Sequence, residues 1–284
     1  MELQTVDELR AHVHRMWSGV ACRWADNADD VDRRGAEVAE RMLAGAAVRP
    51  GDRVLELACG PGGAGLAAAA RVGPGGEVVL SDVVPEMTSI AAARARSSGL
   101  DNVRTATLDL EQIDQPDGSY DVVLCREGLM FAVQPDCAVN EMHRVLRPGG
   151  RISVAVWGPQ KENPWLGIVF EALTAITGSA VPPPGIPGPF ALDDQARLGS
   201  LMEAAGFADI TIEQLPTPLR SPSFDAWWAR TKAVAGPVAA IIARLDATTT
   251  VALEQRLRAA AAPYTTSAGL ELPGLTILVS ASRP

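Results

Sequence analysis

Three glycines at the end of a short apolar run have the spacing of a nucleotide-binding turn. Gly60, Gly62 and Gly65 follow the pattern G-x-G-x-x-G, and an alanine-rich stretch, residues 66–72, comes directly after them. A strand, a glycine turn and a helix in this order build the nucleotide pocket of doubly wound α/β domains. Small residues let the backbone approach a ligand, and the helix N-terminus offers free N–H groups. Asp82 closes the next apolar run, where a carboxylate suits the hydroxyls of a ribose.

Glu56 indicates which kind of nucleotide this turn binds. It precedes Gly60 at the carboxyl end of the expected strand, which is the ligand-binding edge of such a sheet. A carboxylate there repels a pyrophosphate and attracts a cationic ligand or one with an ammonium group. The pattern Glu-x-x-x-Gly-x-Gly-Gly resembles motif I of the class I S-adenosylmethionine (SAM) methyltransferases, in which the acid helps to hold the methionine end of the cofactor.

The resemblance covers residues 50–157. This segment is similar above all to the methyltransferases of quinone biosynthesis and to those that act on small molecules. Four further strand-like segments follow in the family's order: residues 77–82, 103–110, 120–125 and 144–157. The resemblance implies SAM as the cofactor and S-adenosylhomocysteine (SAH) as its product. It implies the following cofactor-binding residues: Glu56, Gly60, Gly62, Asp82, Val83, Met87, Asp109, Leu110 and Arg126. In that family the positions of Asp109 and Leu110 read the adenine edge, and an apolar side chain at the position of Met87 packs on the adenine.

The same resemblance implies an α/β fold with a Rossmann-like, doubly wound sheet of seven strands. Residues 209–215 are expected to form strand six and residues 275–281 strand seven. The implied sheet order is 3-2-1-4-5-7-6, with strand seven antiparallel and with helical lid insertions around the core.

We expect one structural domain whose additions to the core form the acceptor site. Residues 1–46 are expected to form two helices over the active site, at 6–20 and 31–46. The SAM-binding core spans residues 47–215, with a loop and helix insert at 158–190. Residues 216–262 are expected to form a helical lid, with helices at 224–235, 237–245 and 250–261, and residues 263–284 the final strand of the core.

Composition and charge restrict the classes of partner. The chain has 284 residues, 47% of them apolar, and a formal net charge of −9. A protein that grips nucleic acid generally shows a basic face, but Arg33 and Arg34 form only a pair, which we expect on a solvated helix face. We therefore expect a small-molecule acceptor and no nucleic acid. No apolar run approaches the roughly 18 residues of a membrane helix, so we expect no membrane partner. We also expect a monomer or a homodimer.

The cysteines indicate neither a metal site nor a disulfide framework. The four are Cys22, Cys59, Cys125 and Cys137, and their spacing has no paired metal-ligand pattern. Reduced thiols in the cytoplasm are therefore the expectation, and no metal is expected.

Methyl transfer to an oxygen or carbon nucleophile often needs a base. Of the three histidines, His14 is the candidate, because it shares a helix face with Trp17. His143 is expected to pack against the sheet, and Glu127 is the alternative base. The expected acceptor is a small neutral molecule, and its expected binding residues are Trp17, Met130, Phe131 and Trp157.

Three functional interpretations remain open from the sequence. The first is a SAM-dependent methyltransferase that acts on an O, C or N atom of a small apolar or aromatic molecule. The second is a SAM-binding protein of the same fold that does not methylate, either a cyclase-type enzyme or a binding module. The third is an NAD-dependent oxidoreductase that uses the three glycines, against which Glu56 and Asp109 argue.

Overall fold

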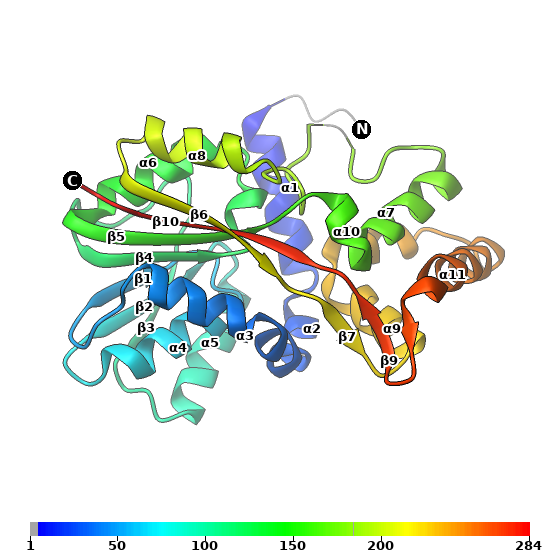
Figure 1. Ribbon diagram of the computed structural model, residues 1–284, viewed down its shortest axis with the longest axis horizontal. Helices are drawn as coiled ribbons and strands as arrows, with labels where there is room; N and C mark the ends of the chain where they lie inside the picture. The colour runs from blue at the N-terminus through cyan, green and yellow to red at the C-terminus, as the bar shows by residue number, and fades with distance from the viewer. Residues whose placement is uncertain (1–4, 184) are drawn as a thin grey trace.

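A seven-stranded sheet runs through the computed structural model, which describes residues 5–183 and 185–284 (Figure 1). Its order is β3-β2-β1-β4-β5-β10-β6, and β10 is antiparallel to both of its neighbours. The expected order and the antiparallel seventh strand are therefore confirmed. The strands are β1 (Arg53–Glu56), β2 (Glu77–Asp82), β3 (Val103–Thr107), β4 (Tyr120–Arg126), β5 (Leu146–Trp157), β6 (Ala208–Pro216) and β10 (Leu275–Ser282).

Apolar side chains on both faces of the central strands explain why helices cover the sheet on both sides. On one face Leu80 of β2 and Leu124 of β4 are fully buried, and on the other face Leu55 of β1 and Val123 of β4 are fully buried, as in parallel sheets with two covered faces. One face packs on α3 (Ala28–Gly45), α4 (Gly63–Val72) and α5 (Pro85–Ser97). The other packs on α6 (Pro135–Val145) and α8 (Gln195–Ala204). Figure 1 shows these two layers on opposite sides of the strands.

The N-terminal segment forms three helices where two were expected. They are α1 (Val6–Ser18), α2 (Ala21–Asp26) and α3. Thr5 begins α1 with a capping box, in which it accepts the N–H of Glu8 while Glu8 accepts the N–H of Thr5. The chain breaks at Gly19 and again at Asn27, so that α2 packs on α5 and on the later helix α9.

A third group of elements lies beyond the carboxyl ends of the parallel strands and has its own apolar core around Trp227. Its helices are α7 (Pro164–Thr177), α9 (Phe224–Val234), α10 (Gly236–Ile242) and α11 (Ala247–Ala261). A small sheet of β7 (Leu219–Ser221), β9 (Gly269–Leu272) and β8 (Thr265–Thr266) completes the group. The segment 216–262 is therefore not wholly helical, because its first residues continue as a strand. Figure 1 shows this group beside α1 and α2.

Three short 3₁₀ turns connect these elements: η1 (Leu129–Phe131), η2 (Gln160–Glu162) and η3 (Ala262–Tyr264). Within the ranges that the structure describes, no helix combines the length and apolar character needed to cross a membrane.

Candidate functional site

The glycine turn between β1 and α4 has a backbone that other residues would strain. Gly60 and Gly62 have φ values of +52° and +94°, in the left-handed region that favours glycine. A Cβ atom on Gly62 would also lie 3.0 Å from the side chain of Leu80. Gly65 leaves room for the carboxylate of Glu56, which accepts the N–H of Gly65 at 2.9 Å. The sequence pattern thus ties the strand, the turn and the helix together through one buried acid.

Glu56 lies behind the turn and does not line the cavity in front of it. Glu56 is 1% exposed. Burial raises the pKa of the Glu56 carboxyl to about 8, although the nearby Arg126 guanidinium and the Gly65 N–H act in the opposite direction. In this structure Glu56 organises the turn and faces the charge of Arg126.

A first cavity of about 160 Å³ opens at the carboxyl ends of β1, β2 and β4. Asp82 lines it, and its carboxylate accepts the N–H groups of Gly60 at 2.9 Å and Val84 at 3.0 Å. Burial raises the pKa of Asp82 above its usual value. Of the residues expected from sequence, the cavity wall includes His14, Trp17, Gly60, Asp82, Val83, Met87, Asp109, Leu110, Arg126, Phe131 and Trp157. Gly62 supports the turn from behind and is not in this wall.

Arg126 has a guanidinium that its protein partners do not satisfy. Its side chain is 8% exposed, and its Nη2 lies 3.5 Å from Asp32, which Arg94 binds more closely at 2.5 Å. Its Nη1 has no hydrogen-bond partner among the residues described. A carboxylate ligand would supply the missing acceptor, so the wall fits the amino-acid end of SAM. Asp82, in the same wall, suits the hydroxyls of the ribose.

Arg10 and Glu111 also line this cavity, and sequence reasoning missed both. Arg10 of α1 binds Glu111 at 2.7 Å, and Glu111 accepts the N–H groups of Val133 at 2.5 Å and Gln134 at 3.2 Å. These contacts hold α1 across the mouth of the sheet. No local pattern marks this pair, because the two residues are far apart in the chain.

A second cavity of about 100 Å³ adjoins the first, and aromatic, aliphatic and charged side chains line it. The residues that line both cavities are Trp17, Trp24, Val31, Glu127, Phe131 and Trp157. Trp17 meets Phe131 edge to face, with ring centroids 4.9 Å apart, and the indole N–H of Trp24 donates to the Val234 carbonyl of α9 at 2.9 Å. Met130 lines neither cavity: it is 1% exposed and lies in the core beneath η1.

The two adjacent arginines of α3 have opposite environments, so the expectation that both lie on a solvated face is wrong for Arg34. Arg33 is exposed and pairs with Asp30 at 2.5 Å. Arg34 lines the second cavity, and its guanidinium carbon lies 3.8 Å from the centroid of the Trp165 ring. Burial lowers the pKa of Arg34 to about 10. Successive helix residues point about 100° apart, so only one of the pair can face inward.

The histidines occupy three different environments. His14 lies in the wall of the first cavity, and His12 lines neither cavity. The ring of His143 packs edge to face on Phe207 at 5.0 Å. Burial lowers the pKa of His143, as does Arg283.

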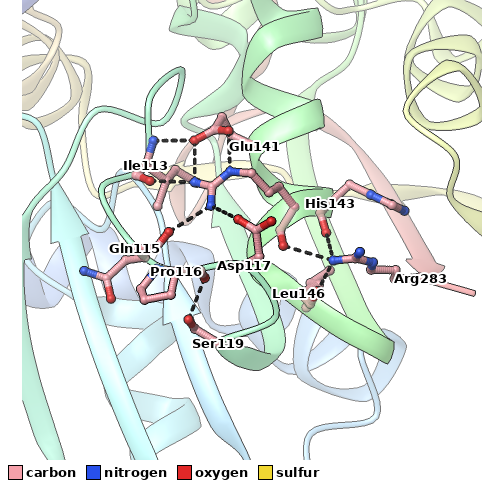
Figure 2. A network of polar contacts seen from close by, with 10 residues as sticks. Ile113, Gln115, Pro116, Asp117, Ser119, Glu141, His143, Leu146 and Arg283 are labelled. Carbon is pink, nitrogen blue, oxygen red and sulfur yellow. Dashed lines mark hydrogen bonds and ion pairs between the residues drawn. The ribbon is translucent and has the colours of Figure 1, made fainter.

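Figure 2 shows His143 in a polar network at the opposite edge of the sheet. Arg283 donates to the carbonyls of His143 at 3.0 Å and Arg144 at 2.9 Å. Arg144 in turn bonds to Asp117 at 2.6 Å and to the Ile113 carbonyl at 2.7 Å. This network holds α6 in place. It lies far from the site, because β4 and β5 begin here and end at the cavities.

No group of three or more His, Cys, Asp or Glu residues within the described ranges could hold a metal ion.

Known proteins resemble this chain over the segment that forms the sheet and the first cavity. A family profile described as "Methyltransferase domain" matches residues 49–206, more than half of the chain. The ubiquinone/menaquinone biosynthesis C-methyltransferase UbiE of Cupriavidus necator is 33% identical over 182 residues, which are 59% of this chain and 72% of that protein. The protein of the same name from Ralstonia pickettii is 38% identical over 138 residues, and the match covers 44% of this chain and 56% of that protein's length.

The fold also matches solved structures. The YcgJ protein of Bacillus subtilis superposes with a TM-score of 0.59 at 21% identity, over 87% of this chain and 98% of that one. At this identity the likeness concerns the fold.

Proposed function

We propose, because this chain belongs to the class I SAM-dependent methyltransferases, that it transfers a methyl group from SAM to an O, C or N atom of a small molecule with an apolar or aromatic body. One observation carries the proposal. A cavity whose walls suit SAM adjoins a second cavity with aromatic walls, and six residues are common to both. A methyl donor and an acceptor could therefore meet at this junction.

The first cavity is assigned to the cofactor. Asp82 would accept the ribose hydroxyls, and Asp109 with Leu110 would bind the adenine edge. Arg126 would bind the carboxylate of the methionine end. When bound, SAM supplies an electrophilic methyl group on a sulfonium.

The second cavity is assigned to the acceptor. Trp17, Phe131 and Trp157 would hold its apolar body and exclude water at the junction. Glu127 lines both cavities, and it could accept a proton from the acceptor's reacting atom, whereas His14 lines only the first. The names of the two UbiE relatives make quinones a first group of acceptors to test.

The decisive experiment combines cofactor binding with a screen of acceptors. Calorimetry should give a micromolar Kd for SAM or SAH, which corresponds to roughly 8 kcal/mol, and no binding of NAD. Quinones, phenols and polyketide-like molecules are then tested for methyl transfer, with SAH release as the readout. Binding of NAD without SAM would reject the proposal. SAM binding without SAH release from any acceptor would favour a non-methylating SAM enzyme instead.

The cofactor assignment has its own test. Asp82→Ala should weaken SAM binding by roughly 1–3 kcal/mol, because ribose hydroxyls lose a charged acceptor. Asp101→Ala is the matched control, since Asp101 is exposed and lines neither cavity. Unchanged affinity in Asp82→Ala would place the ribose elsewhere.

A further inference from the structure

We propose that the acceptor carries an anionic oxygen group, a carboxylate or an ionised hydroxyl, and that Arg34 in the second cavity binds it. This inference rests on the proposed function, since it names the chemical class of molecule that the acceptor site takes. It replaces the neutral acceptor expected from the sequence.

Arg34 is the first observation. Its guanidinium lies over the ring of Trp165 and makes no hydrogen bond or ion pair with any residue that the structure describes. The ring beneath it is fixed, because the indole N–H of Trp165 donates to Asn163 at 2.9 Å and both residues are buried. Arg34 is thus held in the wall of a cavity with its hydrogen-bond donors unused.

The other charged groups in the wall of the second cavity do not pair with Arg34. Asp30 lines the cavity, and its carboxylate binds Arg33 at 2.5 Å and lies 3.9 Å from Arg230. Glu127 acts on Arg34 electrostatically but forms no ion pair with it among the described contacts. Neither carboxylate in this wall, Asp30 or Glu127, pairs with Arg34, so its guanidinium remains without an acceptor among the described residues.

Arg34 is partly buried, and a guanidinium that loses water without gaining an acceptor is stabilised when a ligand pairs with it. Burial lowers the pKa of Arg34 to about 10, so the group remains cationic at neutral pH. Planar guanidinium suits the two oxygens of a carboxylate, and the ring beneath it leaves the edge of the fork free for hydrogen bonds. Trp17, Phe131, Trp157 and Phe170 surround the same space and would contact the rest of the ligand.

The test compares two pairs of probes that differ in charge and hardly in shape. They are 2-naphthoate with 2-naphthamide, and octanoate with octanamide. Binding is measured by calorimetry at pH 7.5, with and without saturating SAH. We expect at least one acid to bind wild-type protein at least about tenfold more tightly than its amide, as a charge-assisted hydrogen bond would give.

Variants of helix α3 locate the effect. Arg34→Gln should weaken binding of that acid by about tenfold to hundredfold and of its amide by less than about threefold. Arg34→Lys, which keeps the charge, should lose less than Arg34→Gln. Arg41→Gln is the matched control: Arg41 lies on the same helix, is exposed and pairs with Glu213 away from both cavities.

Three results would overturn the inference: neither acid binds wild-type protein, both amides bind as tightly as their acids, or Arg34→Gln weakens acid and amide equally. The last result would assign Arg34 a packing role between α3 and Trp165. SAH affinity is measured in every protein, so a failure of the cofactor site, which would reject the proposed function, is seen separately. The wild-type comparison stands even where a variant does not fold.

Discussion

Glu56 is the residue whose environment gives the clearest dependence on pH. The pKa of its carboxyl is about 8 in the folded protein, whereas the usual value for a glutamate is 4.5. Between these values the folded carboxyl keeps a proton that the unfolded one releases. The contribution of Glu56 to the free energy of unfolding is therefore fully present below pH 4.5, and it is lost as the pH rises toward 8.

Glu56→Gln should remove this loss, because a neutral amide can still accept the Gly65 N–H. In thermal or urea unfolding without cofactor, the variant should gain roughly 1–3 kcal/mol on wild type between pH 5 and pH 8. Glu37→Gln, at an exposed position of α3, should show no such trend. A difference between Glu56→Gln and wild type that stays constant with pH would contradict the assignment of burial as the main cause.

Glu127 and His14 compete for the role of base. Since Glu127 lines both cavities and His14 only the first, we expect Glu127→Gln to lower turnover by roughly 10²–10⁴-fold on an acceptor that must lose a proton. His14→Ala should lower it by less than about tenfold. SAH affinity measured alongside should stay unchanged in Glu127→Gln. The opposite ranking of the two variants would return the role to His14.

At the scale of elements, the contact of α4 with β1 depends on the missing side chain of Gly65. A Cβ atom there would lie 2.1 Å from Leu80 and 2.4 Å from the Glu56 carboxylate. Gly65→Ala should therefore cost roughly 1–3 kcal/mol of stability and weaken SAM binding, because the turn must shift. Gly75→Ala is the matched control, since a Cβ on Gly75 would meet nothing within 4 Å. Urea unfolding and calorimetry would show the difference, and equal effects would refute this account of the turn.

At the scale of the whole molecule, the core around Trp227 is separate from the two cores that flank the sheet. Trp227 is fully buried and donates its indole N–H to the Trp165 carbonyl at 3.2 Å. Trp227→Ala should lower stability by roughly 3–5 kcal/mol and weaken acceptor binding, because Trp165 lines the second cavity. SAH affinity below the unfolding transition should change little. Trp227→Phe should lose less stability and less acceptor binding than Trp227→Ala. An SAH affinity that falls as much as acceptor binding would contradict the separation of this core from the cofactor cavity.

The strand–turn–helix unit could be predicted from short-range signals in the sequence, whereas the order of the sheet was implied by the resemblance to the class I methyltransferases. Apolar runs mark the strands, and Gly60, Gly62 and Asp82 stand at fixed spacings from them. The resemblance to the family added further residues of the wall of the first cavity, among them Asp109 and Arg126. The break between α1 and α2 and the strand β7 lay beyond the short-range signals, since element boundaries depend on packing partners as well as on local pattern.

Only the tertiary structure decided which side chains meet at the second cavity. Arg33 and Arg34 are neighbours with the same chemistry, and the position of α3 against Trp165 alone distinguishes them. Arg10 reaches Glu111 because α1 folds back over the sheet, and no local pattern encodes that contact. The sequence thus determined the glycine motif, whose causes are local, and through its resemblance to a family it implied the topology, whereas the unpaired guanidinium in the second cavity follows from contacts between segments far apart in the chain.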